Sequence, residues 1–110
     1  MEISDVVFEK RDGILTARIY CDVDHHRARR LREQTDREIF LNRPRLLVLD
    51  FSGVDHMDSS GIALILGRAE CMDSIGGRIF LEGLNGTMRR LIKLSGVDRV
   101  PNVTVSAPNY

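Results

Sequence analysis

Two adjacent serines stand where a helix is expected to begin, in the sequence Asp-Ser-Ser-Gly at positions 58–61. An unbroken apolar run at 46–49 predicts a buried strand before them, and apolar residues at 62–66 predict a helix after them. The first turn of a helix leaves backbone N–H groups without partners, and Asp and Ser side chains accept hydrogen bonds from these groups. One interpretation of the segment is therefore a helix cap and nothing more.

The other chemistry that suits this position is phosphorylation. The dipole and the free N–H groups of a helix N-terminus attract an anion, and a phosphate on Ser59 would add about −1.5 to −2 charges there. We expect the helix to tolerate this charge, so that phosphorylation would act on whatever touches the surface. Asp58, and the loop that contains Asp22 and Asp24, would add to the negative charge.

Catalytic and metal chemistry are less well supported by the residues. A nucleophile elbow requires Gly-x-Ser-x-Gly, and the leading glycine is absent here. His25 and His26 are neighbours that would point about 100° apart on a helix, which makes them poor joint metal ligands. Cys21 and Cys71 lack the spacing of a metal site. We expect no enzyme activity and no cofactor.

A cluster of arginines precedes the serines, at positions 27, 29, 30, 32 and 37. Acidic residues are interleaved with them, and no aromatic platform for stacking bases accompanies them. The cluster therefore indicates a solvated helix face or the rim of a protein interface, and we expect no direct contact with nucleic acid.

The elements that must position these residues follow from hydrophobic periodicity and turn signals. Asp12-Gly13 predicts a hairpin, and the apolar run at 46–49 predicts a central strand covered by helices on both sides. The expected strands are 6–10, 14–21, 45–51, 78–82 and 102–107, and the expected helices are 25–41, 58–74 and 85–94. The order β-β-α-β-α-β-α-β predicts an α/β fold with a mixed, mostly parallel sheet in which the first strand is antiparallel.

Length and charge limit the possible settings of the protein. The 110 residues are expected to form one domain spanning 1–110, with its core at about 6–107. Sixteen basic and sixteen acidic residues cancel, so no general attraction to nucleic acid or anionic membranes is expected. The N-terminus does not resemble a signal peptide, and the longest apolar run is too short to span a bilayer. A cytoplasmic location is expected.

Four segments together resemble the anti-sigma factor antagonist family, whose domain is the STAS domain. The family's motif of a strand, a loop and Asp-Ser-Ser-Gly at the start of a hydrophobic helix matches residues 57–66. The other three segments are Asp24-His25-His26, Gly76-Gly77 and the stretch 90–97. The resemblance covers about residues 6–105. Two departures are a missing glycine in the stretch 21–24 and the lack of room for a fourth helix after Val105.

This resemblance implies a regulatory role. Members of the family bind an anti-sigma factor that is also a GHKL-type serine kinase, and so displace the sigma factor. The kinase uses ATP and magnesium to phosphorylate the first serine of the motif, which is Ser59 here, and a PP2C-type phosphatase reverses the reaction. Asp24 matches a family aspartate near this serine. The alternative within the same fold is a constitutive scaffold or accessory subunit of a signalling or transport complex, without a phosphorylation cycle.

A partner-binding surface is expected around Ser59. Helical geometry places Ile62, Ile65, Leu66 and Ala69 on the core stripe, with Leu64 nearer the other side. Leu64 would then be an exposed anchor, or it would pack under a neighbouring helix. The predicted partner-binding residues are Asp22, Asp24, His25, Met57, Asp58, Ser60, Gly61, Leu64 and Arg68.

Overall fold

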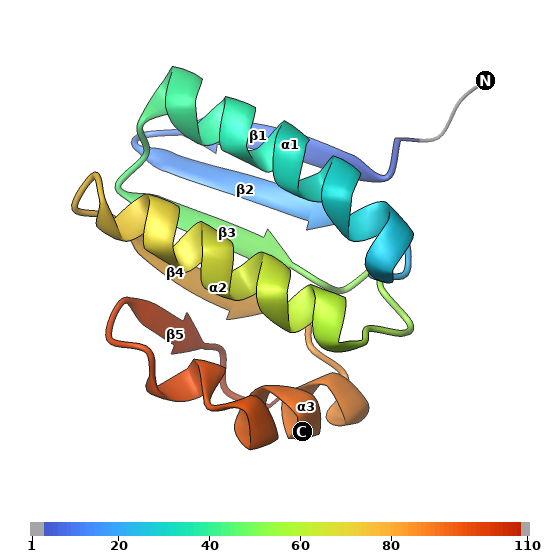
Figure 1. The fold of residues 1–110 in the computed structure, drawn as a ribbon. Helices are drawn as coiled ribbons and strands as arrows, with labels where there is room; N and C mark the ends of the chain where they lie inside the picture. Colours follow the sequence, from blue (N-terminus) through green and yellow to red (C-terminus); the bar gives the residue numbers. More distant parts are fainter. Residues whose placement is uncertain (1–3, 109–110) are drawn as a thin grey trace.

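Five strands form one sheet in the order β1-β2-β3-β4-β5 in the computed structural model, which describes residues 4–108 (Figure 1). The strands are β1 (Val6–Arg11), β2 (Ile14–Ile19), β3 (Leu46–Asp50), β4 (Arg78–Glu82) and β5 (Val103–Val105). The helices are α1 (His25–Asn42), α2 (Ser59–Asp73), α3 (Gly86–Ser95) and the 3-10 turn η1 (Val97–Arg99). The expected domain span of 1–110 includes terminal residues outside the described range.

The predicted fold class is confirmed. β1 pairs antiparallel with β2, and every other neighbouring pair is parallel. The hairpin between β1 and β2 turns at Asp12 and Gly13, whose φ angles of 51° and 79° lie in the left-handed region that Asp-Gly tolerates. Since β2, β3 and β4 are parallel and each is followed by a helix, α1, α2 and α3 all begin at the same end of the sheet, beyond the C-terminal ends of these strands.

The helices cover one face of the sheet, so the prediction that β3 is covered on both faces is wrong. α1 and α2 lie side by side in front of the sheet, and α3 lies at the edge beyond β5 (Figure 1). Leu47 and Leu49 point into the core under these helices. Within residues 4–108 no helix covers the opposite face. Val48 is nevertheless only 8% exposed, because it lies between its cross-strand neighbours Thr16 and Phe80.

Smaller differences concern the ends of elements. The last strand is shorter than expected, and the η1 turn before it was not predicted. Gly96 ends α3 with a φ of 83°, as its position in the sequence predicted. No helix in the described range is long and apolar enough to cross a membrane.

Candidate functional site

Two loops lie side by side at the end of the sheet where the helices begin. One loop joins β2 to α1 and the other joins β3 to α2, and a parallel bridge between Val23 and Met57 connects them. The Val23 N–H donates to the His56 carbonyl at 3.0 Å, and the Asp58 N–H donates to the Val23 carbonyl at 3.3 Å. This bridge fixes the start of α1 relative to the start of α2.

An aspartate caps each of these helices. Asp24 accepts a hydrogen bond from the Arg27 N–H at 2.8 Å, and Asp58 accepts one from the Ser60 N–H at 2.7 Å. The backbone hydrogen bond from Arg27, aided by the Arg27 and His26 charges, holds the pKa of Asp24 below its ordinary value. The local physics is that of N-caps, whose side-chain oxygens replace missing helical partners.

Three further polar side chains hold the loop between β3 and α2. Asp50 accepts hydrogen bonds from the N–H and hydroxyl of Ser52 at 2.9 and 2.6 Å. Asp22 accepts one from the His56 N–H at 3.1 Å. Asn85, which caps α3, donates from its amide to the Asp55 carbonyl at 3.0 Å. All three helix starts are therefore linked, and the loop that leads to Ser59 is held in one conformation.

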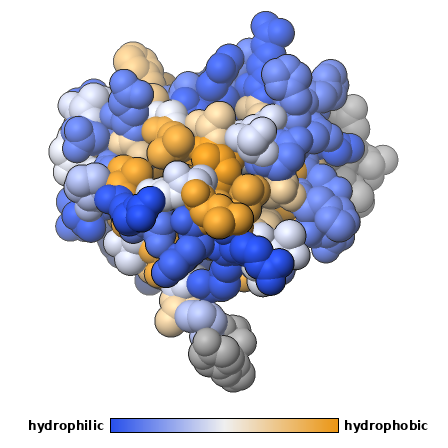
Figure 2. All heavy atoms as spheres, turned by 60° about the horizontal axis from the view of Figure 1, so that its bottom comes forward, coloured by the Kyte–Doolittle hydropathy of each residue, from blue (hydrophilic) through white to orange (hydrophobic). Residues whose placement is uncertain are grey.

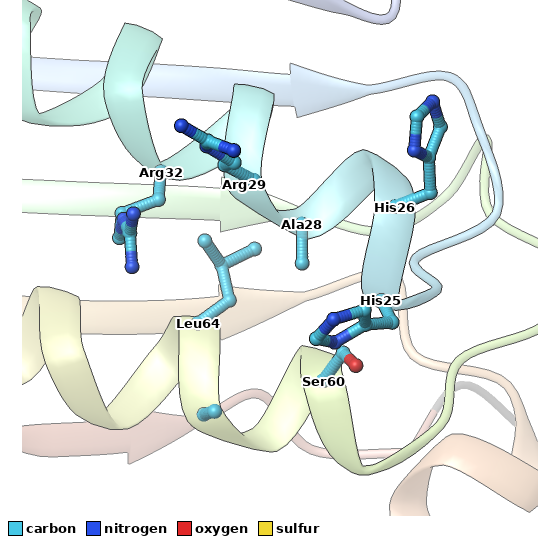
Figure 3. A pocket seen from close by; sticks show the side chains of 8 residues that line it. His25, His26, Ala28, Arg29, Arg32, Ser60 and Leu64 are labelled. Carbon is cyan, nitrogen blue, oxygen red and sulfur yellow. The ribbon is translucent and has the colours of Figure 1, made fainter.

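The two serines of the motif have different surroundings. Ser59 is the first residue of α2 and is exposed, whereas Ser60 is half-buried and faces α1. The Ser60 hydroxyl lies beside the His25 ring, while His26 points away from α2 (Figure 3). No hydrogen bond between either serine hydroxyl and a histidine occurs in the described part of the chain. Ser59 is therefore the serine of the motif that is open to solvent, and Ser60 is the one that lies between the two helices.

Gly61 has a structural reason to be glycine. A Cβ at this position would overlap the side chain of Met57, which is half-buried against the first turn of α2. Gly61 is itself buried, so it is not part of an exposed partner-binding face as predicted. Its absent side chain lets the loop pack directly onto the helix.

The prediction that Leu66 lies on the core stripe of α2 is wrong, whereas the other three residues of that stripe are buried. Leu64 is 5% exposed and lines the groove against α1, which is the packed alternative, whereas Leu66 is 41% exposed and not in the core. The exposed residues of the helix, besides its ends, are Ala63, Leu66 and Glu70, at spacings of four, seven and eleven from Ser59. These spacings place them on one face, with Leu66 about 10 Å along the axis from Ser59.

Arg68 was also expected at the surface, but it is 4% exposed. Its Nε lies 2.8 Å from Asp36 Oδ1 of α1, at an angle that does not make a hydrogen bond. One of its two terminal nitrogens, Nη1, is buried without a hydrogen-bond partner in the described range. Arg68 is thus part of the contact between the two helices, because α1 covers the side of α2 that was expected to face solvent.

Apolar side chains gather beside the exposed face of α2. Figure 2 shows the side of the molecule on which α2 and α3 come forward, with hydrophobic spheres at its centre and hydrophilic spheres around them. The exposed large hydrophobic residues of these helices are Leu66 and Leu94, the latter 79% exposed. A contiguous apolar patch with a polar rim is typical of a protein-binding surface.

The structure thus brings most of the predicted residues together. Asp22, Asp24, His25, Met57 and Asp58 lie on the two bridged loops or directly after them, next to Ser59 and Ser60. Gly61, Leu64 and Arg68 lie on the packed sides of α2. Asn85 and Leu66 were missed: the Asn before a helix is a recognisable cap signal, but its link to Asp55 is visible only in the fold. No three His, Cys, Asp or Glu side chains of residues 4–108 converge as metal ligands.

Comparison with known proteins gives consistent results. The model of the STAS domain family matches residues 5–107. Two curated relatives are named anti-sigma F factor antagonist. The relative from Lysinibacillus sphaericus is 31% identical over 80 residues, which cover 73% of this chain and 68% of the relative. The relative from Paenibacillus polymyxa is 30% identical over 95 residues, which cover 86% of this chain and 81% of the relative.

Among solved structures, that of the anti-sigma factor antagonist SpoIIAA in its unphosphorylated form is similar to this chain. It superimposes with a TM-score of 0.78 at 25% sequence identity, and the match covers 93% of this chain and 88% of that chain.

Proposed function

Because this chain belongs to the STAS domain family of anti-sigma factor antagonists, we propose that it binds an anti-sigma factor and that phosphorylation of Ser59 releases the complex. The observation that carries the proposal is the position of Ser59. It is an exposed hydroxyl at the first residue of α2, and it shares one helix face with Ala63 and Leu66. A partner that covers this face would cover the serine as well.

Charge supplies the physical basis of release. Asp22, Asp24 and Asp58 all lie within one residue of the bridge between Val23 and Met57, so carboxylates already surround the start of α2. A phosphate would add about −1.5 to −2 charges beside them. The helix N-terminus accommodates an anion, so the fold stays intact while the surface that meets the partner changes its charge. Repulsion of a partner fitted to the unphosphorylated surface is the expected result.

The partner would be an anti-sigma factor that is itself a GHKL-type serine kinase. In the transfer, Ser59 Oγ would form a bond to the γ-phosphorus of ATP, the bond from that phosphorus to ADP would break, and the hydroxyl proton would pass to a base on the kinase. Magnesium would accompany ATP on the kinase. A PP2C-type phosphatase would hydrolyse the phosphoserine and restore binding. This chain would then be the substrate and the binding partner of the kinase and would supply no catalytic group. We expect the cycle to take place in the cytoplasm.

The test is capture of partners from a lysate of the native host on wild type, Ser59→Ala and Ser59→Asp, with mass spectrometry of the retained proteins. A GHKL-type kinase should be retained by wild type and Ser59→Ala, and its affinity for Ser59→Asp should fall at least about tenfold, or about 1.4 kcal/mol. Thr104→Asp is the matched control, because it adds the same charge at an exposed position on β5. A partner set that is indifferent to Ser59 would instead indicate a constitutive scaffold or accessory subunit.

A further inference from the structure

A groove of about 410 Å³ lies between the first turns of α1 and α2 and carries positive charge along one wall (Figure 3). The charged or titratable residues that line it are His25, His26, Arg29 and Arg32 of α1, and no carboxylate lines it. Arg32 extends toward the gap above Leu64 (Figure 3). The groove begins at Ser60, so it adjoins the proposed phosphorylation site.

The floor of the groove is apolar and is formed by small or buried side chains. Ala28 of α1 faces Ala63 and Leu64 of α2. These side chains are small, or in the case of Leu64 buried, so they leave space for the aliphatic part of another side chain. A guest with an apolar stem and a negative end fits this combination.

The described part of the chain leaves one of the two groove arginines, Arg32, without a counter-charge and pairs the other only at the surface. Within residues 4–108, Arg32 makes no salt bridge, and Arg29 makes one exposed contact, of 3.4 Å, with Glu33. Asp36 lies one turn beyond Arg32, but it is already paired with Arg68. The contrast with the carboxylates around Ser59 is sharp: the surface next to α2 is acidic on the loops and basic along the groove.

We propose that this groove receives an acidic helical segment of the same protein partner, an inference that rests on the proposed function. Arg29 and Arg32 are three residues apart on α1, which places their Cβ atoms about 5–6 Å apart. Two Glu side chains one turn apart on a partner helix match that spacing, and their methylene groups pack on Ala63 and Leu64. The contacts are exposed and electrostatic, so they steer and orient the partner and weaken with salt.

The direct test uses a defined probe, an alanine-based helical peptide of about 16 residues with glutamates four apart on one face, and its glutamine counterpart. Binding to the ¹⁵N-labelled protein is followed by NMR at low salt. The glutamate peptide should shift the amide resonances of Arg32 and Ala63, and Arg32→Glu should weaken binding at least about fivefold. Arg37→Glu is the matched control, because Arg37 is exposed on the same helix, makes no salt bridge in the described range and lies outside the groove. Equal binding to both variants, or no binding to wild type, would overturn the proposal.

The same two variants separate this inference from the proposed function in the capture experiment. Loss of the kinase from Arg32→Glu but not from Arg37→Glu supports the groove. Capture that responds to Ser59→Asp and is equal for the two arginine variants overturns the groove and leaves the proposed function standing. Capture that responds to Arg32→Glu and ignores Ser59 retains the groove and refutes the phosphorylation switch.

Discussion

The connections at the two ends of the sheet are stabilised in different ways. At the end where α1, α2 and α3 begin, the polar side chains of Asp24, Asp58 and Asn85 cap the helices. At the opposite end, backbone geometry and packing make the turns. Gly76 has a φ of 74°, and Gly77 fits against Met72 and the Arg45 carbonyl, where a Cβ would approach to 2.5 and 3.1 Å.

The difference indicates a division between binding and stability. Exposed side-chain caps leave a polar surface that a partner can contact, and their individual contributions to folding are modest. Buried packing at the far end contributes more to the free energy of folding and leaves few exposed side chains for a partner to contact. Substitutions at the far end should therefore change stability and spare binding, and those at the near end should do the reverse.

The largest effect is expected for Met72→Ala at the far end. Met72 is fully buried, and its removal should lower the free energy of unfolding by about 3 kcal/mol, equivalent to a fall in Tm of about 15 °C. Urea and thermal denaturation measure this change. The affinity of the folded variant for the partner at low temperature should stay within about twofold of wild type. Loss of binding with the fold intact would contradict the division between a binding end and a stabilising end.

A smaller effect is expected at the α2 cap. Asp58→Ala removes the acceptor for the Ser60 N–H and should lower the free energy of unfolding by about 1 kcal/mol. Asp58→Asn keeps an acceptor of the same shape, so its stability should change by only a few tenths of a kcal/mol. Urea denaturation of the two variants compares them, and an equal loss in both would show that charge, and not capping, is what stabilises this end.

Arg43→Gly should make the protein slightly more stable. Arg43 follows α1 with a φ of 44°, a conformation in which a side chain is strained and glycine is not. After the greater entropy of an unfolded glycine is subtracted, the net gain is about 0.5 kcal/mol. Arg37→Gly in the interior of the same helix is the control and should cost about 1 kcal/mol. A decrease in the Tm of Arg43→Gly would contradict the expectation.

The smallest change in stability is expected for Ser59→Asp. A negative charge at the first residue of α2 is favourable to the helix dipole, so the free energy of unfolding should stay within about 0.5 kcal/mol of wild type. Ser74→Asp places the same charge at the other end of this helix and should be destabilising by about 0.3–1 kcal/mol. Circular dichroism and thermal melting give both values. A fall in Tm of more than about 8 °C for Ser59→Asp would mean that phosphorylation acts by unfolding.

The sequence predicted features that depend on local chemistry. The Asp-Gly hairpin, the helix start at Ser59 and the end of α3 at Gly96 all follow from residues close in the chain. The errors arose where a distant element decides exposure. Leu64 and Leu66 are two positions apart in one apolar run, and only the placement of α1 determines that Leu64 is covered and Leu66 is not.

The open sheet face is a second error of this kind. Val48 belongs to the unbroken apolar run that predicted helices on both faces of β3, but its burial comes from Thr16 and Phe80 on adjacent strands. The arginines of α1 are a third case, because the interleaved acids in the sequence conceal a groove whose lining contains no carboxylate.

The contact between Arg68 and Asp36 also sets the register of the two helices. Interdigitated apolar side chains already resist sliding of one helix along the other, and a buried guanidinium that leaves its carboxylate would in addition lose its counter-charge. The pair therefore favours one register of α2 along α1. It keeps Ser60 level with His25, and so keeps the loops and the groove in line as one continuous surface.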